Sequence, residues 1–117
     1  MPSSQFAPND NYDLAATIAA GQTTSDVIDL GGTDLCGLFI PPEFDGTALT
    51  ITASPTAGGT FVTVQSGGSD YTLTVAASKY CPIENLAVVA GLRFIKLVAG
   101  TVQATTATVI PLATRPI

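Results

Sequence analysis

Residues 47–65, TALTITASPTAGGTFVTVQ, carry the strongest structural signal in the chain. In the first half of this segment Leu49 and Ile51 alternate with threonines, and the second half is again rich in apolar and β-branched residues. Neighbouring side chains of a β-strand point to opposite faces, so a period of two places one face on a core and the other in water. Gly58 and Gly59 between the halves allow the chain to reverse. The segment therefore predicts two strands joined by a glycine-containing loop.

Similar short apolar stretches recur along the chain, bounded by Gly and Pro. They lie at residues 27–30, 35–40, 71–75, 79–83, 92–99 and 105–113. Residues 86–89 fit either a short strand or a helical turn. A parallel arrangement needs helical crossovers, for which this spacing leaves no room. The 117 residues therefore predict one all-β domain, built as a two-sheet sandwich or a barrel.

The composition supports a packed domain rather than disorder. Hydrophobic residues make up 46% of the chain and charged residues 11%, whereas disordered segments combine low hydrophobicity with high charge. The residues expected to contribute to the core are Leu49, Ile51, Phe61, Val64, Phe94, Ile95 and Leu97.

The first 22 residues differ in composition from the rest, with two prolines and a polar Asn-Asp-Asn run. We expect residues 1–22 to form an irregular arm and residues 23–117 to form the β-domain. The arm holds apolar groups with no neighbouring strand to bury them, which predicts contact with a neighbouring subunit, with its own domain, or a frayed end. The candidate contact residues are Phe6, Tyr12, Leu14 and Ile18.

No stretch reaches the ~20 apolar residues that a membrane helix needs, and the N-terminus lacks the features of a signal peptide. We therefore expect synthesis in the cytoplasm and no membrane partner. Disulfides rarely persist in that compartment, so Cys36 and Cys81 are predicted to be free thiols.

Residue types that carry chemistry are scarce. The chain has no histidine, the commonest general base and metal ligand. Its acidic residues fall mostly in turns; Asp26, Asp29 and Asp34 lack the spacing of a calcium loop. With four basic residues and a net charge of -5, a nucleic-acid backbone would be repelled. We expect no catalytic, cofactor-binding or metal-binding residues, no nucleic-acid partner and no enzymatic activity.

Three stretches carry a resemblance to a known group of proteins. Residues 25–64 contain a strand ending in IDLGG, a leucine-glycine strand ending at proline, and a strand ALTITAS followed by a turn to Thr-Phe. Residues 91–101 read GLRFIKLVAGT, and the chain ends in VIPLATRPI. Together they resemble small structural proteins encoded among the head genes of tailed bacteriophages.

This resemblance implies a virion structural protein, foremost a capsid cement (decoration) protein. Such a protein would be a homotrimer on the capsid surface, assembled in the host cytoplasm, with the major capsid protein as partner. The expected fold is then an antiparallel β-sandwich of the jelly-roll type. The alternative is a neck, head-fibre or tail component with possible carbohydrate or receptor contact.

A free carbohydrate-binding module is the third reading of the sequence. The segment LTITASPTAGGTFVTV is also similar to a hairpin of galactose-binding-like jelly rolls, but residues 55–58 replace the acidic turn usual there. Tyr12, Tyr71 and Tyr80 could stack on sugar rings if clustered, although tyrosines more often cover the ends of a β-core. The missing acidic turn disfavours sugar binding.

Overall fold

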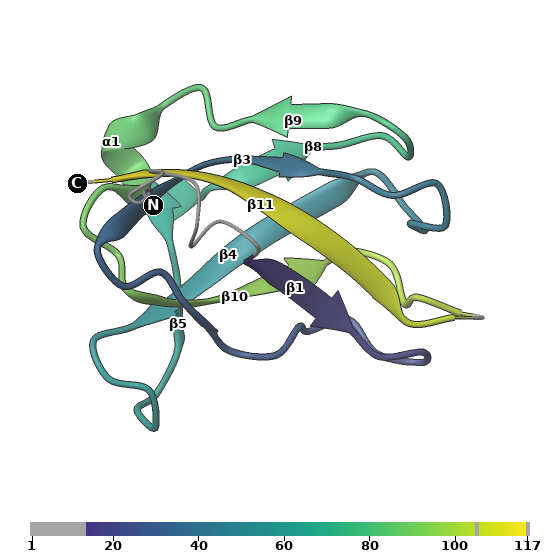
Figure 1. The fold of residues 1–117 in the computed structure, drawn as a ribbon, viewed down its shortest axis with the longest axis horizontal. Coiled ribbons are helices and arrows are strands. Elements are labelled where there is room, and N and C mark those ends of the chain that lie inside the picture. Colours follow the sequence, from purple (N-terminus) through teal and green to yellow (C-terminus); the bar gives the residue numbers. More distant parts are fainter. Residues whose placement is uncertain (1–13, 105, 117) are drawn as a thin grey trace, which may run out of the picture.

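The computed structural model describes residues 14–104 and 106–116. Two antiparallel sheets pack around one core (Figure 1). The first sheet has the order β1 (Ala15–Ile18), β11 (Thr108–Pro116), β3 (Thr33–Phe39) and β9 (Tyr80–Pro82). The second has β2 (Ile28–Asp29), β10 (Phe94–Ala99) and β4 (Ala48–Ser54), with β5 (Val62–Thr63) and β8 (Thr72–Thr74) both on the far side of β4. The predicted all-β, antiparallel character is confirmed.

The remaining elements are small. β6 (Gln65–Ser66) and β7 (Ser69–Asp70) form a separate hairpin. Its turn residues Gly67 and Gly68 both have positive φ, 64° and 85°, as the type I′ turn of a two-residue hairpin requires. Residues 86–89, which fitted a strand or a helical turn, form the single-turn helix α1 (Leu86–Val89). Within the described ranges no helix is long and apolar enough to cross a membrane.

The pairing of β4 with β10 forms the centre of the core. Leu49 and Ile51 of β4 and Ile95 and Leu97 of β10 are fully buried, as predicted. Phe94 is only half-buried, because it precedes Ile95 and consecutive strand residues face opposite ways.

Phe61 and Val64 are also only partly buried. Val64 packs against the edge of the core. The Phe61 ring instead lies under a surface cation, with Lys96 Nζ 4.5 Å from its centroid. These two residues flank the short strand β5 and do not belong to the core proper.

The structure differs from the expectation of an irregular arm over residues 1–22. Residues 15–18 form β1, which pairs antiparallel with β11. Ala16 and Ile18 are fully buried. The partner strand lies at the other end of the chain, so the local sequence holds no sign of it. The domain therefore includes β1, and residues 1–13 lie outside the described part of the chain.

A buried glutamine connects the loops at one end of both sheets. Gln103 is fully buried. Its Oε1 accepts from the Asp45 backbone N–H and the Thr108 hydroxyl, both at 2.9 Å. Its Nε2 donates to the carbonyl oxygens of Asp45 and Thr101 at 2.9 and 3.0 Å. The backbone of Gln103 makes two further hydrogen bonds. Its carbonyl oxygen accepts from Gly21 N–H at 2.7 Å, and its N–H donates to Gln22 O at 3.0 Å. Every polar group of this buried residue is thus satisfied.

We predict that Gln103→Leu lowers the free energy of unfolding by about 2–3 kcal/mol, because it leaves the buried Thr108 hydroxyl and part-buried backbone groups of Asp45 and Thr101 without partners. Denaturant titration measures the change. The matched control is Gln65→Leu on the exposed β6–β7 hairpin, where the change should stay within about 0.5 kcal/mol. Equal effects of the two substitutions would contradict a structural role for the buried amide.

Candidate functional site

One side of the sandwich is closed by hydrogen bonds from a single aspartate. Thr17 N–H in the edge strand β1 donates to Asp26 Oδ1 at 2.9 Å, and Asp26 N–H donates to Thr17 O at 3.1 Å. The adjacent Ser25 joins the same segment to the other sheet. Its N–H donates to Leu97 O at 2.8 Å, and Leu97 N–H donates to Ser25 Oγ at 2.9 Å. The β1 edge is therefore protected from pairing with another chain.

Much of the outer face of the first sheet is apolar. Along β11, Thr108, Ile110 and Leu112 are buried, whereas Val109 and Pro111 point outward and are exposed. On the neighbouring strands Phe39 stands opposite Tyr80. The two rings pack with their centroids 4.7 Å apart and their planes at 46°. Phe39 is 50% exposed and Tyr80 46%, so this aromatic pair is at the surface of the protein.

Gly37 makes this arrangement possible. A Cβ atom at this position would collide with the ring and hydroxyl of Tyr80. Because the glycine has no side chain, the tyrosine ring lies across β3 beside Phe39 instead of standing away from the sheet.

We define the apolar face as the apolar part of the outer surface of these four strands. Its residues are Ala15, Gly37, Phe39, Tyr80, Pro82, Val109, Pro111 and Ala113. Thr17 lies beside Val109 at the edge of this part, and the charged residues Asp34 and Arg115 lie beyond the bulge at Ala113 and Thr114. With strands ~4.8 Å apart and ~3.3 Å per residue, the face covers a few hundred Å2, the size of the larger exposed patches on monomers, which often mark interaction sites.

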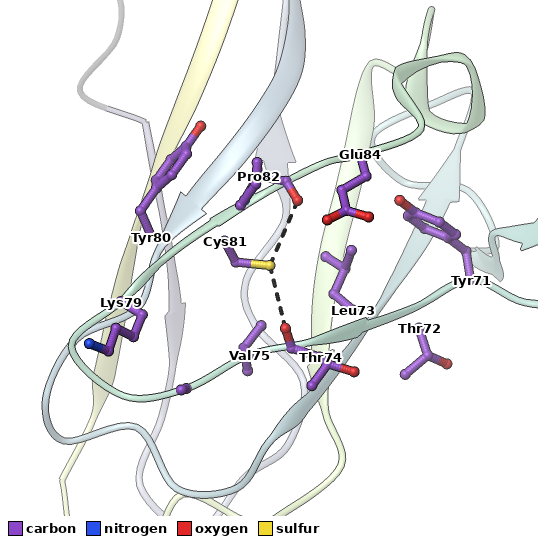
Figure 2. Close-up of a pocket in the computed structure, with 11 residues that line it drawn as sticks. Tyr71, Thr72, Leu73, Thr74, Val75, Lys79, Tyr80, Cys81, Pro82 and Glu84 are labelled. Carbon is purple, nitrogen blue, oxygen red and sulfur yellow. Dashed lines mark hydrogen bonds between the residues drawn. The ribbon is translucent and has the colours of Figure 1, made fainter.

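A groove lies next to this face, between β8 and β9 at the open side of the sandwich (Figure 2). Its volume is about 470 Å3. Leu73 and Val75 lie in it with apolar side chains, and Tyr71 and Glu84 contribute polar groups. Unlike the apolar face, the groove therefore has mixed polarity.

Cys81 narrows the groove near its middle, between Lys79 on one side and Glu84 on the other (Figure 2). Its Sγ lies 3.7 Å from Thr74 O and 3.8 Å from Pro82 O. Burial of the thiol, and then the negative charge of Glu84, raise the pKa of Cys81. A raised pKa keeps the group protonated at neutral pH, and the thiol is a far weaker nucleophile than the thiolate. Cys36 and Cys81 are both free, as predicted.

The predicted contact residues do not form a cluster in the described ranges. Leu14 packs against the core, and its carbonyl oxygen accepts from Leu112 N–H at 2.9 Å. The Ile18 side chain is fully buried in its own domain, so it contacts the core rather than a partner. Phe6 and Tyr12 lie outside the described residues. No group of three or more acidic or cysteine side chains suited to a metal ion occurs among residues 14–104 and 106–116.

The comparisons identify no relative. The chain matches no protein-family model, and comparison with curated proteins and with solved structures finds no significant match.

We predict that Cys81 reacts with iodoacetamide more slowly at pH 8 than a small-molecule thiol of ordinary pKa, because its raised pKa leaves less thiolate at that pH. The measurement uses Cys36→Ala so that a single thiol is followed. The rate should climb with pH through a midpoint above the ordinary value, and Glu84→Gln should move that midpoint down. An unchanged midpoint would contradict the assigned effect of Glu84.

Proposed function

We propose that this protein is a virion structural protein that stabilises a phage capsid as a cement (decoration) protein. The observation that carries the proposal is the apolar face with its exposed Phe39–Tyr80 pair. A cement must match a broad protein surface rather than enclose a small ligand, and the energy of such interfaces concentrates in a few buried anchors, often aromatic. An exposed aromatic pair on a flat sheet face suits that demand.

Mass action explains how such a protein would strengthen a shell. A protein that binds the assembled capsid better than its separated subunits stabilises the assembly as occupancy rises. The proposed partner is the major capsid protein, and the proposed assembly is a homotrimer seated where capsid subunits meet. In a trimer each bound copy raises the effective concentration of the others at the surface.

The jelly-roll form of the fold belongs to this proposal. One sheet has the order β1-β11-β3-β9. In the other, five-stranded sheet, the order is β2-β10-β4, with β8 and the two-residue strand β5 both paired to β4. With the short strand β5 left aside, the alternation of strands between the two sheets is similar to that of a jelly roll, an architecture common in viral capsid proteins. The strand order thus supports the proposed fold and its structural use.

A neck, head-fibre or tail component is the second candidate. The same apolar face would attach the domain at any of these positions, so the face alone does not favour one location. The two candidates differ in consequence. Particles lacking a cement lose resistance to heat or chelator, whereas particles lacking a fibre or tail component stay robust and fail to adsorb to cells.

We predict that Phe39→Ser reduces the number of copies bound per purified particle about tenfold or more, because a buried aromatic anchor contributes ≥2 kcal/mol to an interface. Quantitative mass spectrometry of sedimented particles measures this number. Val62→Ser is the matched control, since Val62 is 63% exposed and belongs to the other sheet. Equal numbers of bound copies for the two variants would show that the apolar face is not the surface that binds the capsid.

Two deletions separate attachment from folding. Deleting residues 1–13 leaves β1 intact, and we predict weaker attachment to particles with little change in the unfolding midpoint, because Phe6 and Tyr12 are the proposed contacts. Deleting residues 1–22 also removes the buried Ile18 and should lower the free energy of unfolding by at least about 2–5 kcal/mol. Full attachment of the variant lacking residues 1–13 would show that these residues do not contribute to particle binding.

A further inference from the structure

The groove between β8 and β9 exposes backbone groups of both strands. Ile40 N–H donates to Lys79 O and Ile83 N–H to Cys36 O, both at 2.8 Å. In an antiparallel ladder, residues whose N–H and C=O face the partner strand alternate with residues whose N–H and C=O face away. These two bonds make Tyr80 a residue of the second kind, so its N–H and C=O point away from β3, toward the open side.

The same alternation applies to β8. Val75 N–H donates to Thr47 O at 2.8 Å, and Leu73 lies opposite Leu49. The N–H and C=O of Thr72 therefore point away from β4. No strand among the described residues pairs with this edge of β8. The groove thus has unused donors and acceptors at strand spacing.

Cys81 separates two parts of the groove, with Val75, Lys79 and Tyr80 on one side of it (Figure 2). Its Sγ lies 3.7 Å from the Thr74 carbonyl oxygen, which leaves no room for another chain between these two residues. On the other side of Cys81, Tyr71 and Glu84 line the groove, and Figure 2 shows them away from Lys79. Glu84 has no ion pair within the described residues. An aromatic ring and an uncompensated carboxylate together attract a cation.

We propose that this groove binds an extended peptide segment of a partner protein that carries a lysine or arginine side chain. The peptide backbone would hydrogen-bond with Thr72 in the manner of an added strand, and the cationic side chain would lie between Tyr71 and Glu84. The net charge of -5 favours a basic segment as well. The groove borders the apolar face at Tyr80 and Pro82, but the proposed contacts Tyr71, Thr72 and Glu84 do not belong to that face, and the inference goes beyond the proposed capsid function.

The probe is the blocked peptide Ac-Thr-Val-Lys-Val-Thr-NH2, compared with the same peptide carrying norleucine in place of lysine. Titration into the 15N-labelled full-length protein should shift the amide signals of Tyr71, Thr72 and Glu84. The lysine peptide should bind about tenfold more tightly than the norleucine peptide, as expected from one cation–π contact and one exposed ion pair.

Variants identify the groups responsible. Glu84→Gln should remove most of the preference for lysine, whereas Glu43→Gln, at an exposed position outside the groove, should keep it. Val109→Ser, on the apolar face but two strands away from β9, should leave peptide binding unchanged, which separates this site from the apolar face. Equal affinity for the two peptides, shifts confined to residues outside the groove, or saturable shifts of the same three amides by galactose alone would each overturn the proposal.

Discussion

The side-chain amide of Gln103 links the two sheets at one end of the molecule. It lies where the loop before β4, the loop after β10, the start of β11 and the turn after β1 come together. β1 and β11 belong to one sheet, and β4 and β10 to the other. Apolar packing holds the sheets face to face but does not choose their relative position along the strands. A buried amide with one geometry for its donors and acceptors fixes that position, because any slip leaves polar groups without partners.

Hydrogen bonds and side chains at the edge strands of the two sheets limit where a partner can bind. Asp26 occupies the exposed backbone groups of Thr17 in β1, and Pro82 in β9 has no N–H to offer. Cys81 contacts the Thr74 carbonyl of β8. Protected edges suppress uncontrolled sheet extension, and they leave the broad outer face of the first sheet and the open end of the groove as places for specific contact. Face and groove meet at Tyr80, whose ring lies on the face while its backbone borders the groove.

Local alternation in the sequence was sufficient to predict the antiparallel strands and the central core residues of β4 and β10. It could not decide whether Phe94 or Ile95 faces the core, since two adjacent apolar residues do not show which side of the strand is buried. It also missed β1, because that strand is defined by pairing with β11 at the opposite end of the chain. The Phe39–Tyr80 pair was hidden for a similar reason. Leu38 and Phe39 are both apolar, and only the register with β9 and the absence of a side chain at Gly37 place one of them inside and the other on the surface.

The size of the apolar face constrains how it can be used. Burying a few hundred Å2 of apolar surface at ~25 cal/mol per Å2 contributes about 5–10 kcal/mol. Association of two free proteins costs about 4–15 kcal/mol in lost motion and ordering, so a single face would bind weakly, below the ~800 Å2 per partner of a standard stable interface. Attachment through several linked copies, or through the face and a second contact on the same partner, incurs the cost of association once and gains from each additional contact. A face this small therefore favours a protein that acts on a repeating surface, where neighbouring sites are held at fixed spacing, over one that forms an isolated one-to-one complex.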